Sequence, residues 1–71
     1  MKELDAVVLT KDIPSERLTA GDLGTIVHVH DDNHFEVEFV ESTGDTLAVV
    51  TVERTAVRPV AAGEVLHARV L

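Results

Sequence analysis

The sequence predicts an all-β fold, a small barrel built from five short antiparallel strands. Valine is abundant and occurs in short runs, whereas apolar residues at helical spacing are hard to find. Five apolar or alternating segments are separated by residues that are typical of turns. The chain of 71 residues has room for one domain, because a chain of about this length buries only about 60% of its unfolded surface.

The clearest strand pattern lies in residues 34–40. There, two phenylalanines and a valine alternate with Glu36 and Glu38, so that the large apolar side chains share one face. The two aspartates and the asparagine of residues 31–33 predict a turn before this strand, and residues 41–45 predict a hairpin loop after it. The segments expected to form strands are residues 5–10, 24–30, 34–40, 46–52 and 57–60.

The remaining connections favour one architecture over others. Residues 11–22 form a long polar loop, in which Leu18 is the large apolar residue expected to pin the loop to the core. Residues 53–56 suit a single 3₁₀ turn, and Pro59 places the last strand at an edge, because proline cannot donate a hydrogen bond to a ladder. This combination predicts an SH3-like barrel, with a two-layer sandwich as the nearest alternative.

The register of the two central hairpins follows from the apolar pattern. A three-residue turn pairs Val29 with Phe35 and Val27 with Val37 on the inner face of the first hairpin. In the second hairpin, the five-residue loop and the same inward face of residues 34–40 pair Val37 with Val49. The outer face of the fourth strand then consists of Ala48, Val50 and Val52. An apolar outer face predicts that something covers this strand on both sides.

The last residues differ from the rest of the chain. Residues 1–60 are expected to form the barrel, and residues 61–71 are expected to form a C-terminal extension. Leu66, Ala68 and Val70 have the period of two that is typical of a strand with one apolar side. We expect this extension to add a sixth strand, which packs on the barrel or pairs with a partner chain.

The composition excludes several classes of function. Lys and Arg total 6 and Asp and Glu total 13, which gives a net charge of −7. Nucleic acids and anionic membranes are therefore not expected as partners, because both select clustered Lys and Arg. The chain has no cysteine, which excludes a disulfide, a thiolate nucleophile and a cysteine-based zinc site. The first residues lack the apolar run of a signal peptide, so we expect a cytoplasmic protein, and we expect no cofactor.

Three segments carry a resemblance to a known family: residues 21–27 (GDLGTIV), 35–40 (FEVEFV) and 47–52 (LAVVTV). Over roughly residues 3–60, the chain resembles a family of small bacterial proteins known as domain of unknown function 4926. The resemblance implies an SH3-like barrel without an established biochemical activity, and it suggests an antitoxin or immunity role. The Gly-x-x-Gly-Thr-Ile-Val core is also similar to KOW motifs, which imply RNA binding as an alternative.

The residues favour a non-enzymatic protein-interaction module, which binds a small bacterial protein or associates with itself. Aliphatic side chains would be buried against the partner, and the acidic side chains of the first hairpin would orient it. The expected partner-binding residues are Ala48, Val50, Val52, Leu66, Val70, Leu71, Asp31, Asp32, Glu36 and Glu38. No Gly-x-Ser-x-Gly elbow and no glycine-rich phosphate loop is present, so no catalytic residue is expected.

The strand histidines offer an alternative, a metal-binding module. His28 and His30 are two residues apart, so both side chains leave the same face of one strand. His34 begins the next strand, and Glu36 is expected opposite His28. Imidazoles and a carboxylate gathered in this way are ligands that a zinc ion accepts.

Overall fold

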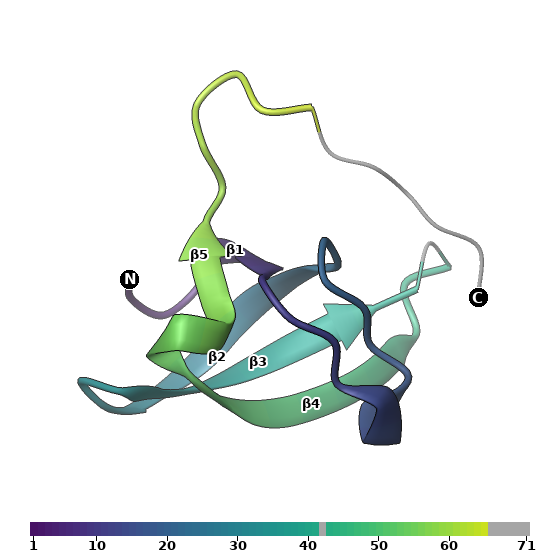
Figure 1. Ribbon diagram of the computed structural model, residues 1–71, viewed down its shortest axis with the longest axis horizontal. Helices are drawn as coiled ribbons and strands as arrows, with labels where there is room; N and C mark the ends of the chain where they lie inside the picture. The colour runs from purple at the N-terminus through teal and green to yellow at the C-terminus, as the bar shows by residue number, and fades with distance from the viewer. Residues whose placement is uncertain (42, 66–71) are drawn as a thin grey trace.

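The computed structural model describes residues 1–41 and 43–65, which form one antiparallel sheet of five strands (Figure 1). The strands are β1 (Ala6–Leu9), β2 (Leu23–Asp31), β3 (His34–Val40), β4 (Thr46–Glu53) and β5 (Val57–Pro59). Two single-turn 3₁₀ helices, η1 (Pro14–Glu16) and η2 (Arg54–Ala56), interrupt them, and the described residues contain no α-helix. The all-β class and the five predicted strands are confirmed, and no described helix is long and apolar enough to cross a membrane.

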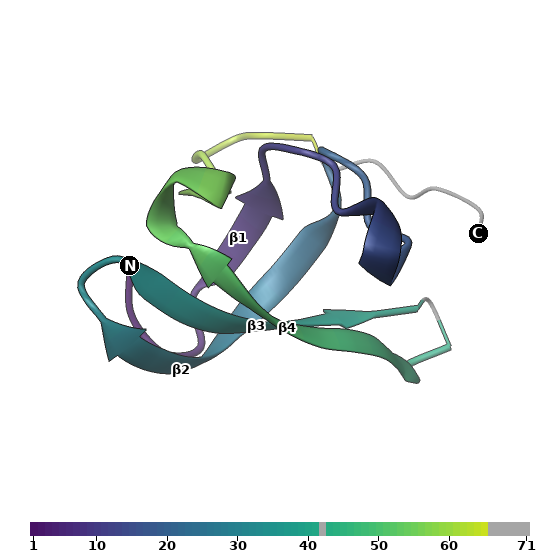
Figure 2. The same cartoon turned by 60° about the horizontal axis from the view of Figure 1, so that its bottom comes forward.

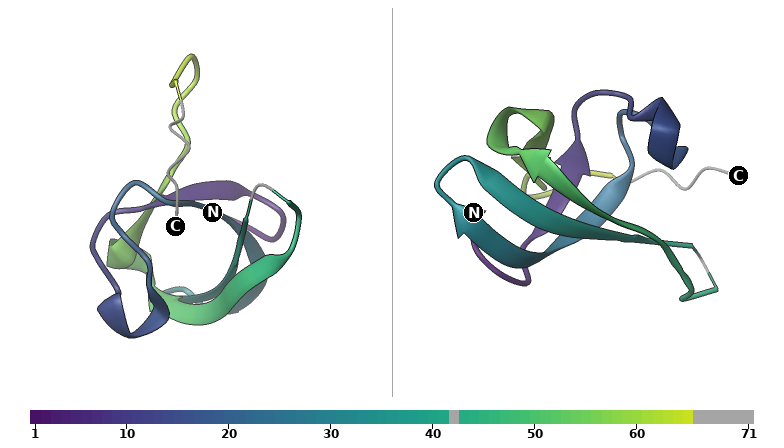
Figure 3. Two further views of the ribbon diagram at one scale, coloured as in Figure 1. Left: turned by 90° about the vertical axis from the view of Figure 1, so that its right-hand side faces the viewer. Right: turned by 90° about the horizontal axis from the view of Figure 1, so that it is seen from below.

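The strand order in the sheet is β4-β3-β2-β1-β5, so that β4 and β5 are the two outer strands. The sheet curls around its core (Figure 3), and Figure 2 shows β1 above the twisted hairpin of β3 and β4. Among the described residues, β4 pairs only with β3 and β5 pairs only with β1. Within this described part of the chain, the sheet is therefore strongly curved and keeps two free edges, so it is not closed into the barrel that the sequence predicts.

The core lies inside the curl of the sheet. Phe35, Val37 and Phe39 of β3 supply its centre, as their alternation with glutamates predicts, and each is at most 3% exposed. The other buried members of the cluster are Val7, Leu9, Leu18, Ile26, Val52, Ala56 and Val57. Complete burial of such a side chain stabilises the fold by roughly 1.5–3 kcal/mol. Leu18 is buried among them, which confirms that it pins the loop between β1 and β2.

The pairing of β2 with β3 keeps the predicted register only in its middle, because irregularities interrupt it between Ile26 and His28 and between Val29 and Asp31. Val29 lies opposite Phe35 as expected, but a bulge between Ile26 and His28 brings Ile26 opposite Val37. The expectation that Val27 points inward is therefore wrong: Val27 is 38% exposed, whereas Ile26 is completely buried. The bulge adds one residue to β2, and this residue allows an isoleucine rather than a valine to fill the core.

Gly24 leaves room for the inward side chains of Val37 and Phe39 where β2 pairs with β3. It is buried, and a Cβ atom at this position would lie 2.6 Å from Cγ1 of Val37 and 3.1 Å from the carbonyl oxygen of Glu38. Any larger residue would push the two strands apart. The glycine of the segment GDLGTIV therefore serves the packing of β2 against β3.

The register between β3 and β4 differs from the prediction by one residue. Val37 lies opposite Val50 and Phe35 lies opposite Val52. The expected outer face of β4 is therefore wrong, because Val52 is only 4% exposed and Val50 packs against the core. A one-residue shift moves every side chain to the other face, and this register buries Val52 in place of Thr51. The outward residues of β4 are Val49 and Thr51.

The segment after β5 turns back on the strand. The two terminal guanidinium nitrogens of Arg58 donate hydrogen bonds to the Glu64 carboxylate, at 2.9 and 2.6 Å, and the backbone N–H of Ala61 donates to the same carboxylate at 2.9 Å. Val65 is 80% exposed. The predicted sixth strand falls on residues 66–71, which lie outside the described residues.

Candidate interaction surface

Burial decreases sharply from β3 to the outer strand β4. The inward residues of β3 are almost completely buried, whereas their partners Ala48 and Val50 on β4 are only partly buried. On the outer face, Val49 is 51% exposed and Thr51 is exposed. Among residues 1–41 and 43–65, nothing pairs with the free edge of β4, and it is accessible from both faces of the sheet. A strand placed beside it would complete the burial of Ala48 and Val50.

The composition of β4 suits it for pairing with another strand. From Thr46 to Val52 the strand contains four aliphatic residues besides its alanine, and it contains no charge and no proline. Exposed edge strands commonly carry lysine, proline or a bulge that prevents association with other chains. The ladder between β3 and β4 has one bulge near the start of β4, where Leu47 is an extra residue between the pairs Phe39–Ala48 and Val40–Thr46. From Ala48 to Glu53 the pairing is regular.

Two glutamates of β3 line the outer face beside β4. Glu38 lies opposite Val49, and Glu36 lies opposite Thr51. The hydroxyl group of Thr46 donates a hydrogen bond of 2.9 Å to the Glu38 carboxylate. The Glu36 carboxylate lies 3.8 Å from Nε2 of His30. The outer face next to the free edge is therefore acidic, with a narrow band of uncharged side chains between the glutamates and the edge.

The other two predicted acidic residues lie where β2 ends and the turn to β3 begins: Asp31 is the last residue of β2 and Asp32 is the first residue of the turn. The Asp31 carboxylate accepts a hydrogen bond of 2.8 Å from the backbone N–H of Asn33 and contacts Nδ1 of His34 at 2.9 Å. The hydrogen bond from Asn33, followed by that with His34, lowers the pKa of Asp31. Asp31 therefore stabilises the turn, and Asp32 is exposed beside it. This turn lies at one end of β3, away from the middle of the β4 edge.

The histidines do not assemble the predicted metal site. Their rings do come together on β2, where the ring centroids of His28 and His30 lie 4.7 Å apart. However, Nδ1 of His28 lies 3.7 Å from the carboxylate of Glu3, and His34 turns toward Asp31 in the hairpin turn. Because His28, His30 and His34 each face a different carboxylate, no group of three ligands that could hold a metal ion forms among the described residues.

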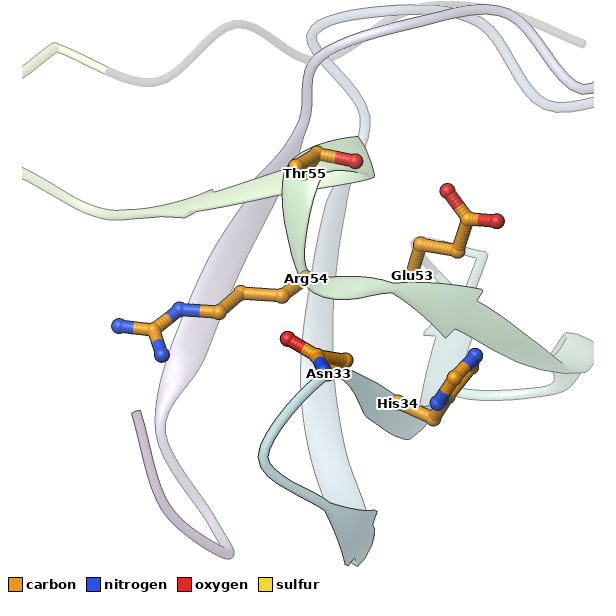
Figure 4. Close-up of a pocket in the computed structure, with 5 residues that line it drawn as sticks. All are labelled: Asn33, His34, Glu53, Arg54 and Thr55. Atoms are coloured by element: carbon orange, nitrogen blue, oxygen red, sulfur yellow. The ribbon is translucent and has the colours of Figure 1, made fainter.

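A pocket that the sequence did not predict lies where the first hairpin meets η2. The backbone N–H of Arg54 donates a hydrogen bond of 2.7 Å to the carbonyl of Asn33, which brings these two segments together. The pocket is lined by Asn33, His34, Glu53, Arg54 and Thr55 (Figure 4). In Figure 4 the side chain of Arg54 points away from Glu53 and His34, so the polar groups do not converge on one point. No local motif signals this pocket, because it depends on a contact between distant segments.

Comparison with protein families assigns the chain to one family. Residues 3–59 match the model of the family described as "Domain of unknown function (DUF4926)". The chain belongs to this family. The match extends from the turn before β1 to the end of β5, and it confirms the resemblance found in the sequence, but the description of the family assigns no activity. Comparison with curated proteins and with solved structures gives no significant match.

The predicted partner-binding residues therefore lie in three different environments. Ala48 and Val50 line the inner side of the β4 edge, whereas Val52 belongs to the core. Glu36 and Glu38 flank the edge on the outer face. Leu66, Val70 and Leu71 lie outside the described residues. Sequence reasoning missed Val49 and Thr51, which the corrected register places on the outer side of the edge.

Proposed function

We propose that this protein is a non-enzymatic interaction module that binds an extended segment of another polypeptide along the free edge of β4. The added segment would pair with the backbone of Thr46–Glu53 and continue the sheet. The observation that carries the proposal is the loss of burial between β3 and β4, where Ala48 and Val50 stay partly exposed although they belong to the inner face. Binding would be stoichiometric, as in an antitoxin or immunity protein of a small bacterial pair.

The energetic basis is the apolar surface that an added strand would cover. Burial of apolar surface stabilises by roughly 25 cal/mol per Å². Backbone hydrogen bonds along the edge supply affinity without selecting a sequence, and the side chains of alternate residues supply selectivity. The metal-binding alternative lacks a ligand group among the described residues. The RNA-binding alternative requires cationic groups near the phosphates, whereas the outer face beside β4 carries Glu36 and Glu38.

A short synthetic peptide tests the proposal. The probe is an octapeptide in which valine and serine alternate, with every second backbone nitrogen methylated, so that only one edge can form hydrogen bonds. We expect the peptide to shift the backbone amide NMR signals of Thr46–Glu53 and to leave those of Val57 and Arg58 in β5 unchanged. The matched control is the same peptide with every nitrogen methylated, which cannot donate along either edge and should not bind. If millimolar peptide leaves the β4 signals unchanged, the proposal is wrong.

A further inference from the structure

The net charge of the protein is confined to one part of the sheet. Residues 23–53, which contain β2, β3 and β4, carry seven Asp and Glu and no Lys or Arg. The rest of the chain carries six acidic and six basic residues, so its formal charge is zero. We call residues 23–53 the acidic segment. The free edge of β4 is therefore also the edge of the acidic segment.

A strand added to β4 would present its side chains alternately to two different environments. Those on the inner face would lie beside Ala48 and Val50, which are partly buried, and Val50 packs against the core. Those on the outer face would lie beside Val49 and Thr51, which are exposed. Because successive side chains of a strand point to opposite faces, one partner segment meets both environments with a period of two.

The outer face favours long cationic side chains. Adjacent strands lie about 4.8 Å apart, so an added strand would run about 10 Å from β3. The methylene groups of a lysine or arginine opposite Val49 would cover this valine while the charged group reaches Glu38. In the same way, a lysine or arginine opposite Thr51 would extend across Thr51, and its charged group would reach Glu36. Within the described residues, neither glutamate has a lysine or arginine within ion-pair distance.

We infer that the segment bound by β4 alternates aliphatic residues with lysine or arginine, the aliphatic ones facing Ala48 and Val50 and the basic ones facing Glu36 and Glu38. This inference rests on the proposed function, and it names the chemistry of the partner. The partner is a different polypeptide rather than a second copy, since pairing two acidic segments edge to edge would bring like charges together.

Three peptides that differ only in charge test the inference. All are alternately N-methylated octapeptides with valine on one face, and they carry lysine, serine or glutamate on the other. At low salt we expect the lysine peptide to bind about tenfold more tightly than the serine peptide, since two exposed ion pairs contribute up to about that much. We expect the glutamate peptide to bind most weakly. The preference for lysine should decrease at high salt, which screens exposed charges.

Substitutions locate the source of this preference. The double variant Glu36→Gln, Glu38→Gln should bind the lysine and serine peptides equally. The control variant Glu3→Gln, Glu16→Gln removes the same number of charges outside the acidic segment, at exposed positions, and should keep the preference. A preference that survives the first variant, or disappears in the control, would overturn the inference.

The outcomes separate this inference from the proposed function. If all three peptides shift the β4 signals with equal affinity, β4 binds strands but charge does not select them, so the inference fails alone. If no peptide shifts those signals, the proposed function fails and the inference fails with it. Sedimentation of the protein, first alone and then with the lysine peptide, provides the last test. A dimer at micromolar concentration that the lysine peptide dissociates would identify a second copy as the occupant and overturn the inference.

Discussion

The two outer strands of the sheet expose their edges to very different degrees. β5 has three residues and ends in Pro59, which cannot donate a hydrogen bond to another strand. Beside it, Arg58 forms a bidentate ion pair with Glu64, and the Ala61 backbone donates to the same carboxylate. Short length, proline and charge are the usual means by which natural sheets prevent association at an edge. The β5 edge is therefore poorly suited for pairing.

β4 has none of these features along most of its length. It has eight residues, its first charge is Glu53 at the end, and two of its inward side chains, Ala48 and Val50, are partly exposed. The comparison indicates that the edges of this open sheet are not equivalent. Where one sheet carries one protected and one unprotected edge, the unprotected edge is the better candidate for binding. The following predictions test whether this difference is real.

The largest effect is expected on the free energy of unfolding, from alanine substitutions on the neighbouring strands β3 and β4. Val37 of β3 is completely buried, and its cross-strand partner Val50 of β4 is partly buried. Val37→Ala should lower the free energy of unfolding by about 2–3 kcal/mol, because it removes buried methyl groups and leaves a cavity. Val50→Ala should cost about 1 kcal/mol, because water already reaches part of this side chain. Urea denaturation measures both values, and equal losses would mean that β4 is covered as completely as β3.

A smaller effect is expected from charging the β4 edge. Val49→Lys places a cation on the outer face of the edge strand, as many natural edge strands do. We expect it to weaken binding of the alternately methylated valine–serine peptide about fivefold to tenfold, with stability changed by less than about 0.5 kcal/mol. The matched control is Val27→Lys, at another exposed valine that lies in the bulge of β2, away from the edge. Equal weakening by both variants would show that charge acts on binding without regard to position.

The residues that the sequence places correctly are those with an unambiguous pattern. The alternation of residues 34–40 defines β3 without a shift in its bounds, and Pro59 correctly places β5 at an edge. Leu18 is found buried because it is the large apolar residue within an otherwise polar loop. In each case one arrangement satisfies the physical constraint much better than the others.

The predicted strand registers are wrong where two arrangements satisfy the apolar pattern equally well. In β4 both alternating sets are largely aliphatic, so burial of Leu47 and Val49 and burial of Val50 and Val52 are both plausible from the sequence. In β2, the runs of apolar residues around Val27 hide the bulge. The candidate site could also be predicted only in part. Its glutamates are evident from the alternation of β3, but the free edge follows from the order of strands in the sheet.

The smallest effect concerns the ion pair that accompanies the protected edge. The hydrogen bonds from Arg58, together with that from the backbone of Ala61, lower the pKa of Glu64 from its usual 4.5 to about 2. Because this pKa is lower in the folded protein, the ion pair stabilises the fold above about pH 4.5, and this contribution disappears as the pH falls through 2. An NMR titration of the side-chain carboxyl carbon measures the pKa directly. Arg58→Gln should return the pKa most of the way toward 4.5, whereas Arg54→Gln, on η2, should leave it near 2. If Glu64 titrates near 4.5 in the unaltered protein, the segment after β5 is not held by this ion pair. The protection of the β5 edge would then depend on its short length and on Pro59 alone.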